Sequence, residues 1–251
     1  MSIFNRIAAA LMVVFCALSC AVDDTIHYNN VTMGNFSNGQ FITDQGLTYN
    51  IVDQLCEGST DTLKRALIAC DVLGMTADNT YDIRLKAFES IFTKSPVDST
   101  KVTDPDVFVE NPLSIGEVWY AGGYLNMYIY IPMKKGSQQA HMINLVRDDK
   151  DAAEATYNFT LKHNAFGEVF TESDSDFIVG ATYVSFPICN IIKEDAAKIN
   201  LSWTSHAVEN GLWTVQTQRN TTELEWTRGS FEHKIESVSG SGNVQQGLLW
   251  M

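Results

Sequence analysis

The sequence predicts an all-β protein, and three observations carry this prediction. Residues 124–132 (YLNMYIYIP) alternate with a period of two, as expected of a strand whose two faces differ. Strand-like segments recur along the rest of the chain at roughly even spacing and are separated by turn-like stretches. Helical periodicity is scarce, and only residues 194–198 could form a helical turn.

The first predicted elements follow a polar segment. Residues 25–38 are rich in Asn, Thr, Ser and Gly, which is typical of a tether. Strands are then expected at residues 47–55, 64–73 and 81–92, the last of which alternates apolar with charged side chains. Residues 95–105 (SPVDSTKVTDP) combine Pro, Ser, Thr and Asp, so we place a domain boundary there.

The second half of the chain is also predicted to be β. Its expected strands are residues 124–132, 140–146, 156–163, 177–188, 198–206, 212–219 and 223–228, and this number of short strands favours a sandwich. Gly116, Gly122 and Gly123 are expected to serve a bulge or a hairpin turn, because a strand and not a helix follows them. Residues 237–251 are predicted to form a flexible tail with an apolar tip.

The N-terminus is typical of a secreted lipoprotein. Arg6 precedes an apolar run, and residues 7–22 are uncharged over 16 positions, which is short of the roughly 20 that a spanning helix needs. Residues 17–20 (ALSC) are similar to a bacterial lipobox, which predicts a signal peptide at 1–19 and an acylated Cys20. The membrane is therefore an expected partner through this lipid anchor. Cleavage by an ordinary signal peptidase is the alternative. Acidic residues at 23 and 24 resemble the export signal of Bacteroidetes lipoproteins and favour the outer membrane and the cell surface.

Charge and cysteine usage narrow the function classes. The formal net charge of −13 opposes binding to nucleic acid. Besides the acylated Cys20, three cysteines remain after the predicted cleavage, and none lies in a CxxC or zinc-binding spacing. Buried thiols are the favoured interpretation, and a bridge between Cys56 and Cys70 is the alternative.

No catalytic constellation is visible. The five histidines show neither HxxxH nor HxH spacing, and there is no GxSxG, P-loop or GxGxxG motif. His163 and His206 end predicted strands, where exposed or loop-anchoring rings are expected. We therefore predict no catalytic residue, no metal and no cofactor, and expect that the protein is not an enzyme. A site assembled from distant segments is the remaining enzymatic alternative.

Several segments resemble one known family. The lipoprotein start, residues 41–55 (FITDQGLTYNIVDQL), residues 64–73 (KRALIACDVL), residues 124–132 and residues 161–163 with 186–188 are similar in pattern and order to the NigD-like family of Bacteroidetes. This resemblance implies an OB-like barrel at 39–105 after a tether at 20–38, and a β-sandwich at 106–236. It implies no catalytic residues. It implies a binding or protective role at the cell envelope, with immunity to a bacteriocin as the specific form.

Aromatic side chains are the remaining candidates for binding. In the 124–132 strand the apolar residues share one face and the tyrosines share the other, beside Trp119. We therefore predict a ligand-binding face formed by Trp119, Tyr124, Tyr128 and Tyr130, suited to a protein partner or a glycan. The alternative is that both faces of this strand are buried, one within the sandwich and the other against the barrel.

Overall fold

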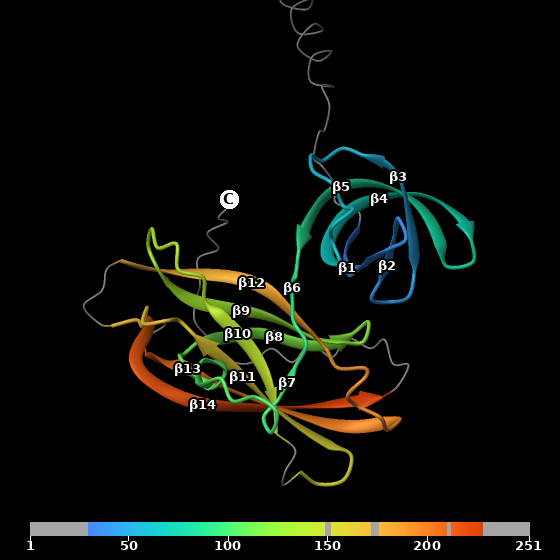
Figure 1. The fold of residues 1–251 in the computed structure, drawn as a ribbon. Helices are drawn as coiled ribbons and strands as arrows, with labels where there is room; N and C mark the ends of the chain where they lie inside the picture. Colours follow the sequence, from blue (N-terminus) through green and yellow to red (C-terminus); the bar gives the residue numbers. More distant parts are fainter. Residues whose placement is uncertain (1–29, 149–151, 172–175, 210–211, 228–251) are drawn as a thin grey trace, which may run out of the picture.

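The computed structural model describes residues 30–148, 152–171, 176–209 and 212–227, which form two β domains (Figure 1). One is a closed five-stranded barrel, and the other is a sandwich of a five-stranded and a four-stranded sheet. A 3₁₀ turn, η1 (Pro105–Phe108), lies between the strands and is capped by the Asp104 side chain. The predicted all-β class, with an OB-like barrel before a sandwich, is confirmed.

The barrel is built from β1 (Asn30–Ser37), β2 (Gln40–Thr43), β3 (Thr48–Gln54), β4 (Arg65–Ala77) and β5 (Thr80–Ser90). Its strand order is β1-β2-β3-β5-β4, and β1 closes it by pairing with β4. The β3–β5 pair is parallel and all other pairs are antiparallel. The barrel core consists of Phe41, Tyr49, Ala66, Ile68, Cys70, Ile83 and Leu85.

The barrel begins earlier than the sequence indicated. Strand β1 lies inside the segment predicted as a tether at 20–38. The sequence did not indicate this strand, because its composition is polar and only Met33 and Gly34 are buried. A Cβ on Gly34 would lie 2.2 Å from the carbonyl oxygen of Ile42, so only glycine lets β1 approach β2 this closely. The rest of the predicted tether, the signal peptide at 1–19, Cys20 and the tail at 237–251 lie outside the described residues.

The sandwich begins at residue 92, earlier than the predicted 106. The two short strands β6 (Phe92–Thr93) and β7 (Val97–Asp98) already pair with the sandwich, β6 with β12 and β7 with β10. Figure 1 shows the chain running down from β5 through these two strands. The polar segment at 95–105 is therefore an edge of the sandwich as well as part of the linker.

The remaining strands are β8 (Ser114–Ala121), β9 (Tyr124–Lys134), β10 (Met142–Arg147), β11 (Thr156–Asn164), β12 (Phe177–Pro187), β13 (Ala196–Glu209) and β14 (Leu212–Thr227). One sheet has the order β14-β13-β11-β10-β7, and the other has the order β6-β12-β9-β8. Strand β8 was not expected from the sequence, and β14 joins two segments that were expected as separate strands. The sheets pack over a core that includes the fully buried Trp203, Phe159 and Phe186.

Strand β9 has two different faces, as its alternation predicted. Leu125, Met127, Ile129 and Ile131 are buried in the sandwich core, and the tyrosines point to the opposite side of the four-stranded sheet. The glycines have their predicted roles: Gly122 and Gly123 take positive φ in the β8–β9 turn, and Gly116 lies at a register shift between β8 and β9.

The cysteines of the described segments are all free thiols, so Cys56 and Cys70 are not bridged. Cys70 is buried in the barrel, as expected, and Cys56 is half-buried, but Cys189 is exposed because it lies in the turn after β12. Within the described part of the chain, no helix is long and apolar enough to cross a membrane.

Candidate functional site

The outer face of the four-stranded sheet is shared between the barrel and solvent. Along β9, the outward side chains are Tyr124, Asn126, Tyr128 and Tyr130, and β12 places Ser185 opposite Asn126 and Tyr183 opposite Tyr128. The barrel lies over the part of this face that holds Asn126 and Ser185, both fully buried. Tyr128, Tyr130 and Tyr183 lie next to the barrel and remain half-buried.

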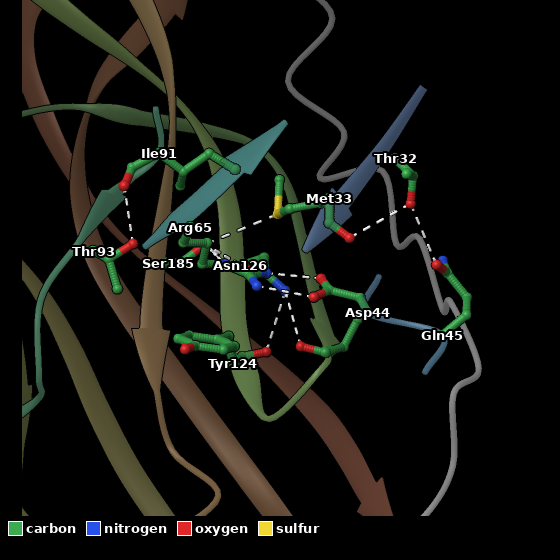
Figure 2. A network of polar contacts seen from close by, with 11 residues as sticks. Thr32, Met33, Asp44, Gln45, Arg65, Ile91, Thr93, Tyr124, Asn126 and Ser185 are labelled. Carbon is green, nitrogen blue, oxygen red and sulfur yellow. Dashed lines mark hydrogen bonds and ion pairs between the residues drawn. The ribbon is translucent and has the colours of Figure 1, made fainter. Parts of the chain in front are cut away.

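A buried ion pair fastens the barrel to this face (Figure 2). Arg65, the first residue of β4, binds Asp44 through two hydrogen bonds of 2.9 and 2.7 Å, and both side chains are almost fully buried. The same guanidinium donates to Ser185 Oγ at 2.9 Å and to Asn126 Oδ1 at 2.8 Å, both in the sandwich. It also stacks on the Tyr124 ring, 4.0 Å from the ring centroid. Every polar group of the pair therefore has a partner, which burial of charge requires.

Apolar packing surrounds this polar network. Met33 from the barrel, Ile91 from the linker, and Trp119 and Ala121 from β8 form one buried cluster. Leu67 and Tyr183 pack against it from the two domains. The turn after β8 is equally close, because a Cβ on Gly122 would lie 2.2 Å from Asp44 Oδ1. The two domains thus share a packed interface and are not joined by the linker alone.

A cleft of about 220 Å³ opens beside this interface. The barrel contributes one wall, and Glu117, Trp119 and Tyr183 of the sandwich form the other. The cleft is lined by Glu117, by Asp44, whose carboxylate is paired with Arg65, and by apolar side chains such as Leu67. It is a small, mixed apolar and acidic hollow.

An aromatic row extends from this cleft across the open part of the sheet. We define it as Trp119, Tyr183, Tyr128 and Tyr130. The ring centroids of Trp119 and Tyr183 are 6.2 Å apart, those of Tyr183 and Tyr128 are 4.7 Å apart, and those of Tyr128 and Tyr130 are 5.2 Å apart. Such spacings give mutually packed rings with defined orientation. Tyr130 also covers Gly116, where a Cβ would lie 2.8 Å from its ring, so the bulge in β8 makes room for the row.

Two carboxylates from different domains act on this row. Glu89 is an exposed residue near the end of β5 in the barrel, and Glu117 is an exposed residue of β8 opposite Tyr128. Burial, the neighbouring tyrosine rings and the negative charges of Glu89 and Glu117 together raise the pKa of Tyr128 and of Tyr183 above the ordinary tyrosine value. The row therefore combines aromatic rings with negative charge from two nearby carboxylates.

The predicted binding residues separate into two groups. Trp119 is 8% exposed and lies under the barrel, and Tyr124 lies under Arg65, so these two fit the alternative of burial against the barrel. Tyr128 and Tyr130 stay at the open part of the face, as the binding hypothesis requires. Sequence reasoning missed Tyr183, although residues 177–188 were expected as a strand, because the pairing of β12 with β9 cannot be read from one sequence.

The histidines match one of the two expected roles. His163 and His206 are buried, with exposures of 1% and 2%, so neither ring is exposed. His163 instead anchors a loop, because its Nδ1 lies 3.3 Å from the carbonyl oxygens of Asn111 and Pro112. His163 Nε2 lies 2.9 Å from His141 Nδ1, and His141 contacts Glu168 at 3.4 Å. Burial and the neighbouring His141 lower the pKa of His163 to about 4, so the ring is neutral at pH 7. Within the described residues no group of three His, Cys, Asp or Glu side chains could hold a metal ion.

A second surface lies on the outer face of the five-stranded sheet, where a polar groove of about 710 Å³ crosses β11, β13 and β14. Arg219 in this groove donates to Glu110 at 2.8 Å, to Ser202 at 2.6 Å and to Thr160 at 3.3 Å. Glu110 also accepts from Lys162. Burial raises the pKa of Glu110, but the hydrogen bonds from Lys162 and Arg219 outweigh it and hold that pKa below the usual value. These charges are paired with one another, so the aromatic row is the better candidate site.

Comparisons with known proteins agree with this architecture. Residues 95–218 match the family model described as the NigD-like C-terminal beta sandwich domain. The fold is similar to that of a NigD-like immunity protein from Bacteroides caccae, with a TM-score of 0.59 and 17% identity over 79% of this chain and 95% of that one. A protein from Bacteroides fragilis, described provisionally as a lipoprotein, gives a TM-score of 0.59 and 13% identity over 80% and 99% of the two chains.

A third similar structure is a protein from Parabacteroides distasonis described provisionally as toxin-related. Its TM-score is 0.54, with 20% identity over 78% of this chain and 91% of that one. At these identities the likeness establishes a shared two-domain fold and nothing about residues or ligands. No curated protein matches the chain.

Proposed function

The chain belongs to the NigD-like family through its C-terminal β-sandwich domain, and we propose that it is a non-enzymatic envelope lipoprotein that binds a protein partner and protects the cell. The specific form of this role is immunity to a bacteriocin. The similar structure from Bacteroides caccae is described as an immunity protein, which supports this choice. A role in binding fits a chain in which the sequence offers no catalytic motif.

The observation that carries the proposal is the open half of the aromatic row, by which we mean Tyr128, Tyr130 and Tyr183. Packed tyrosine rings with polar edges are frequent anchors of protein interfaces, because they bury a large area at little conformational cost. Tyr128, Tyr130 and Tyr183 present such a surface beside a cleft and pack against one another, and Tyr183 also packs against the apolar cluster of the domain interface. A rigid presentation reduces the cost of ordering upon binding.

We also propose that Cys20 carries the lipid anchor and that the protein is displayed on the cell surface. Metabolic labelling with a fatty acid should mark the wild type and not the Cys20→Ala variant. Protease treatment of intact cells should then remove the labelled protein. A labelled but protease-resistant protein would place it on the periplasmic side, and an unlabelled wild type would contradict the anchor.

The test of function is sensitivity of cells to toxins. We expect that deleting the gene increases sensitivity to the bacteriocins of the same and related strains, and that the wild-type gene restores resistance. A Tyr128→Leu variant should fail to restore it, whereas Tyr157→Leu, which replaces a half-buried tyrosine on the opposite sheet, should restore it. Unchanged sensitivity after deletion would refute the immunity role.

Glycan binding is the second candidate, because half-exposed tyrosine rings beside carboxylates also suit a sugar face. An array of surface and dietary glycans, tested with the wild type and with Tyr128→Leu, decides between the two. Binding that is lost in the variant supports the glycan, and no binding removes this candidate.

A further inference from the structure

We propose that the open half of the aromatic row binds an arginine side chain of a basic peptide segment. The guanidinium would stack on the rings of Tyr128 and Tyr183 and pair with the carboxylates of Glu89 and Glu117. This inference rests on the proposed binding function and names the chemistry of the partner. It rests on a repeated arrangement within the sheet, on the absence of a countercharge and on electrostatic complementarity.

The covered half of the same face already holds a guanidinium. Arg65 lies over the Tyr124 ring at 4.0 Å and pairs with Asp44, so a tyrosine face and a carboxylate bind one cation there. Planar guanidinium groups suit this combination, because they stack on aromatic rings and bind carboxylates through paired hydrogen bonds. Tyr128 lies four residues further along β9, on the same face as Tyr124.

The open half presents the same chemistry without a cation of its own. Tyr128 and Tyr183 are packed with ring centroids 4.7 Å apart, and Tyr130 closes one side at 5.2 Å from Tyr128. Glu117 lies opposite Tyr128 on β8, and the negative charge of Glu89, near the end of β5, acts on Tyr128 and Tyr183. Within the described part of the chain, no lysine, arginine or histidine forms an ion pair with Glu89 or Glu117.

The surrounding charge favours a basic partner over an acidic or neutral one. The protein has a formal net charge of −13, and the exposed Glu117 borders the adjoining cleft. An acidic surface attracts a basic peptide over the range of a Debye length, and the ring stack then selects a flat cation. The cleft of about 220 Å³ next to Tyr183 can take the residue that follows the arginine in an extended segment.

The test uses the mature chain with Cys20→Ser, so that no acyl chain is attached, and a short amidated peptide with two arginines. The reference peptide contains citrulline in place of arginine, which keeps the shape and removes the charge. Calorimetric titration at about 0.15 M salt measures both affinities, because weak surface attraction is largely screened there. We expect the arginine peptide to bind at least tenfold more tightly.

Variants locate the binding. Tyr128→Leu and Glu117→Gln should each weaken binding about threefold to tenfold, in line with a cation on a partly buried ring. Tyr128→Phe keeps the ring and should retain the affinity. Glu154→Gln removes an exposed negative charge in the β10–β11 loop, away from the row, and should leave the affinity unchanged. Thermal unfolding confirms that each variant is folded.

Three results would overturn the inference. These are no binding of the arginine peptide, equal binding of the citrulline peptide, and an equal loss in Glu154→Gln and Glu117→Gln, which would mean diffuse attraction to the acidic surface. The immunity role is judged separately by toxin sensitivity. Arginine binding without any change in sensitivity after gene deletion would refute that role and leave the inference standing.

Discussion

The stability of the domain interface should depend on the charge of Asp44. Replacing it by Asn keeps the size of the side chain but leaves the Arg65 guanidinium buried without a counterion. Removal of one partner from a buried pair costs about 3–5 kcal/mol, a large part of the roughly 5–15 kcal/mol that stabilises most proteins. The hydrogen bonds from Arg65 to Ser185 and Asn126 remain, but they supply no negative charge.

The chain contains a matched control for this prediction. Arg84 and Asp53 form an ion pair with the same shortest distance of 2.7 Å, but their side chains are 42% and 45% exposed. Exposed pairs contribute about 0–1 kcal/mol, so Asp53→Asn should change the free energy of unfolding by no more than that. The two pairs share their residue types and shortest distance, and they differ in burial and in the number of hydrogen bonds, since Arg84 makes one bond to Asp53 whereas Arg65 makes two to Asp44.

The assay is urea unfolding of both variants, followed by circular dichroism and tryptophan fluorescence. A double variant, Arg65→Met with Asp44→Leu, removes both charges and should be more stable than Asp44→Asn, because apolar replacement of a whole buried pair is often neutral. Ser185 can still donate to Asn126, so no polar group is stranded. A loss below about 1 kcal/mol in Asp44→Asn, or a double variant as unstable as the sum of its parts, would refute this reasoning.

Three further predictions concern other parts of the fold. The pKa of His163 is lowered to about 4, so between about pH 6.5 and 4 the unfolded chain binds a proton that the folded chain does not. The free energy of unfolding should therefore fall by about 2 kcal/mol from pH 7 to pH 5. His163→Gln should reduce this dependence of stability on pH. Gly122→Ala should destabilise more than Gly39→Ala, because both have positive φ but only the first places a Cβ 2.2 Å from Asp44, and equal losses in urea unfolding would contradict this. Burial raises the pKa of the Cys70 thiol to about 11, so this thiol should resist alkylation at pH 8 until urea unfolds the barrel, and rapid labelling of the native protein would argue against its burial.

Much of the fold could be predicted from local patterns. The two faces of β9 follow from strict alternation in YLNMYIYIP, and the β8–β9 turn follows from the paired glycines. Strand β1 could not be found in this way, because its composition is polar and its burial depends on its neighbours β2 and β4. Composition describes a single segment, whereas a barrel is defined by which segments pair.

The candidate site was only partly accessible to sequence reasoning. Tyr128 and Tyr130 could be proposed because they share one strand, but Tyr183 joins them only through the register of β12 against β9. The Arg65–Ser185 contact joins residues 120 positions apart, and no local signal marks either residue. For the same reason the burial of Trp119 and Tyr124 could not be predicted, since it depends on where the barrel lies.

The same sheet face both holds the domains together and presents the open rings, which couples stability to binding. Glu89 belongs to β5 of the barrel and Glu117 to β8 of the sandwich, so the position of the barrel determines the distance between the two carboxylates. Asp44→Asn weakens the Arg65 network that joins the barrel to the sandwich and leaves Tyr128 unchanged. We therefore expect this variant, assayed in conditions where it is folded, to bind the arginine peptide more weakly than the wild type. Unchanged affinity would mean that the apolar cluster around Met33 and Ile91 alone keeps the barrel in place.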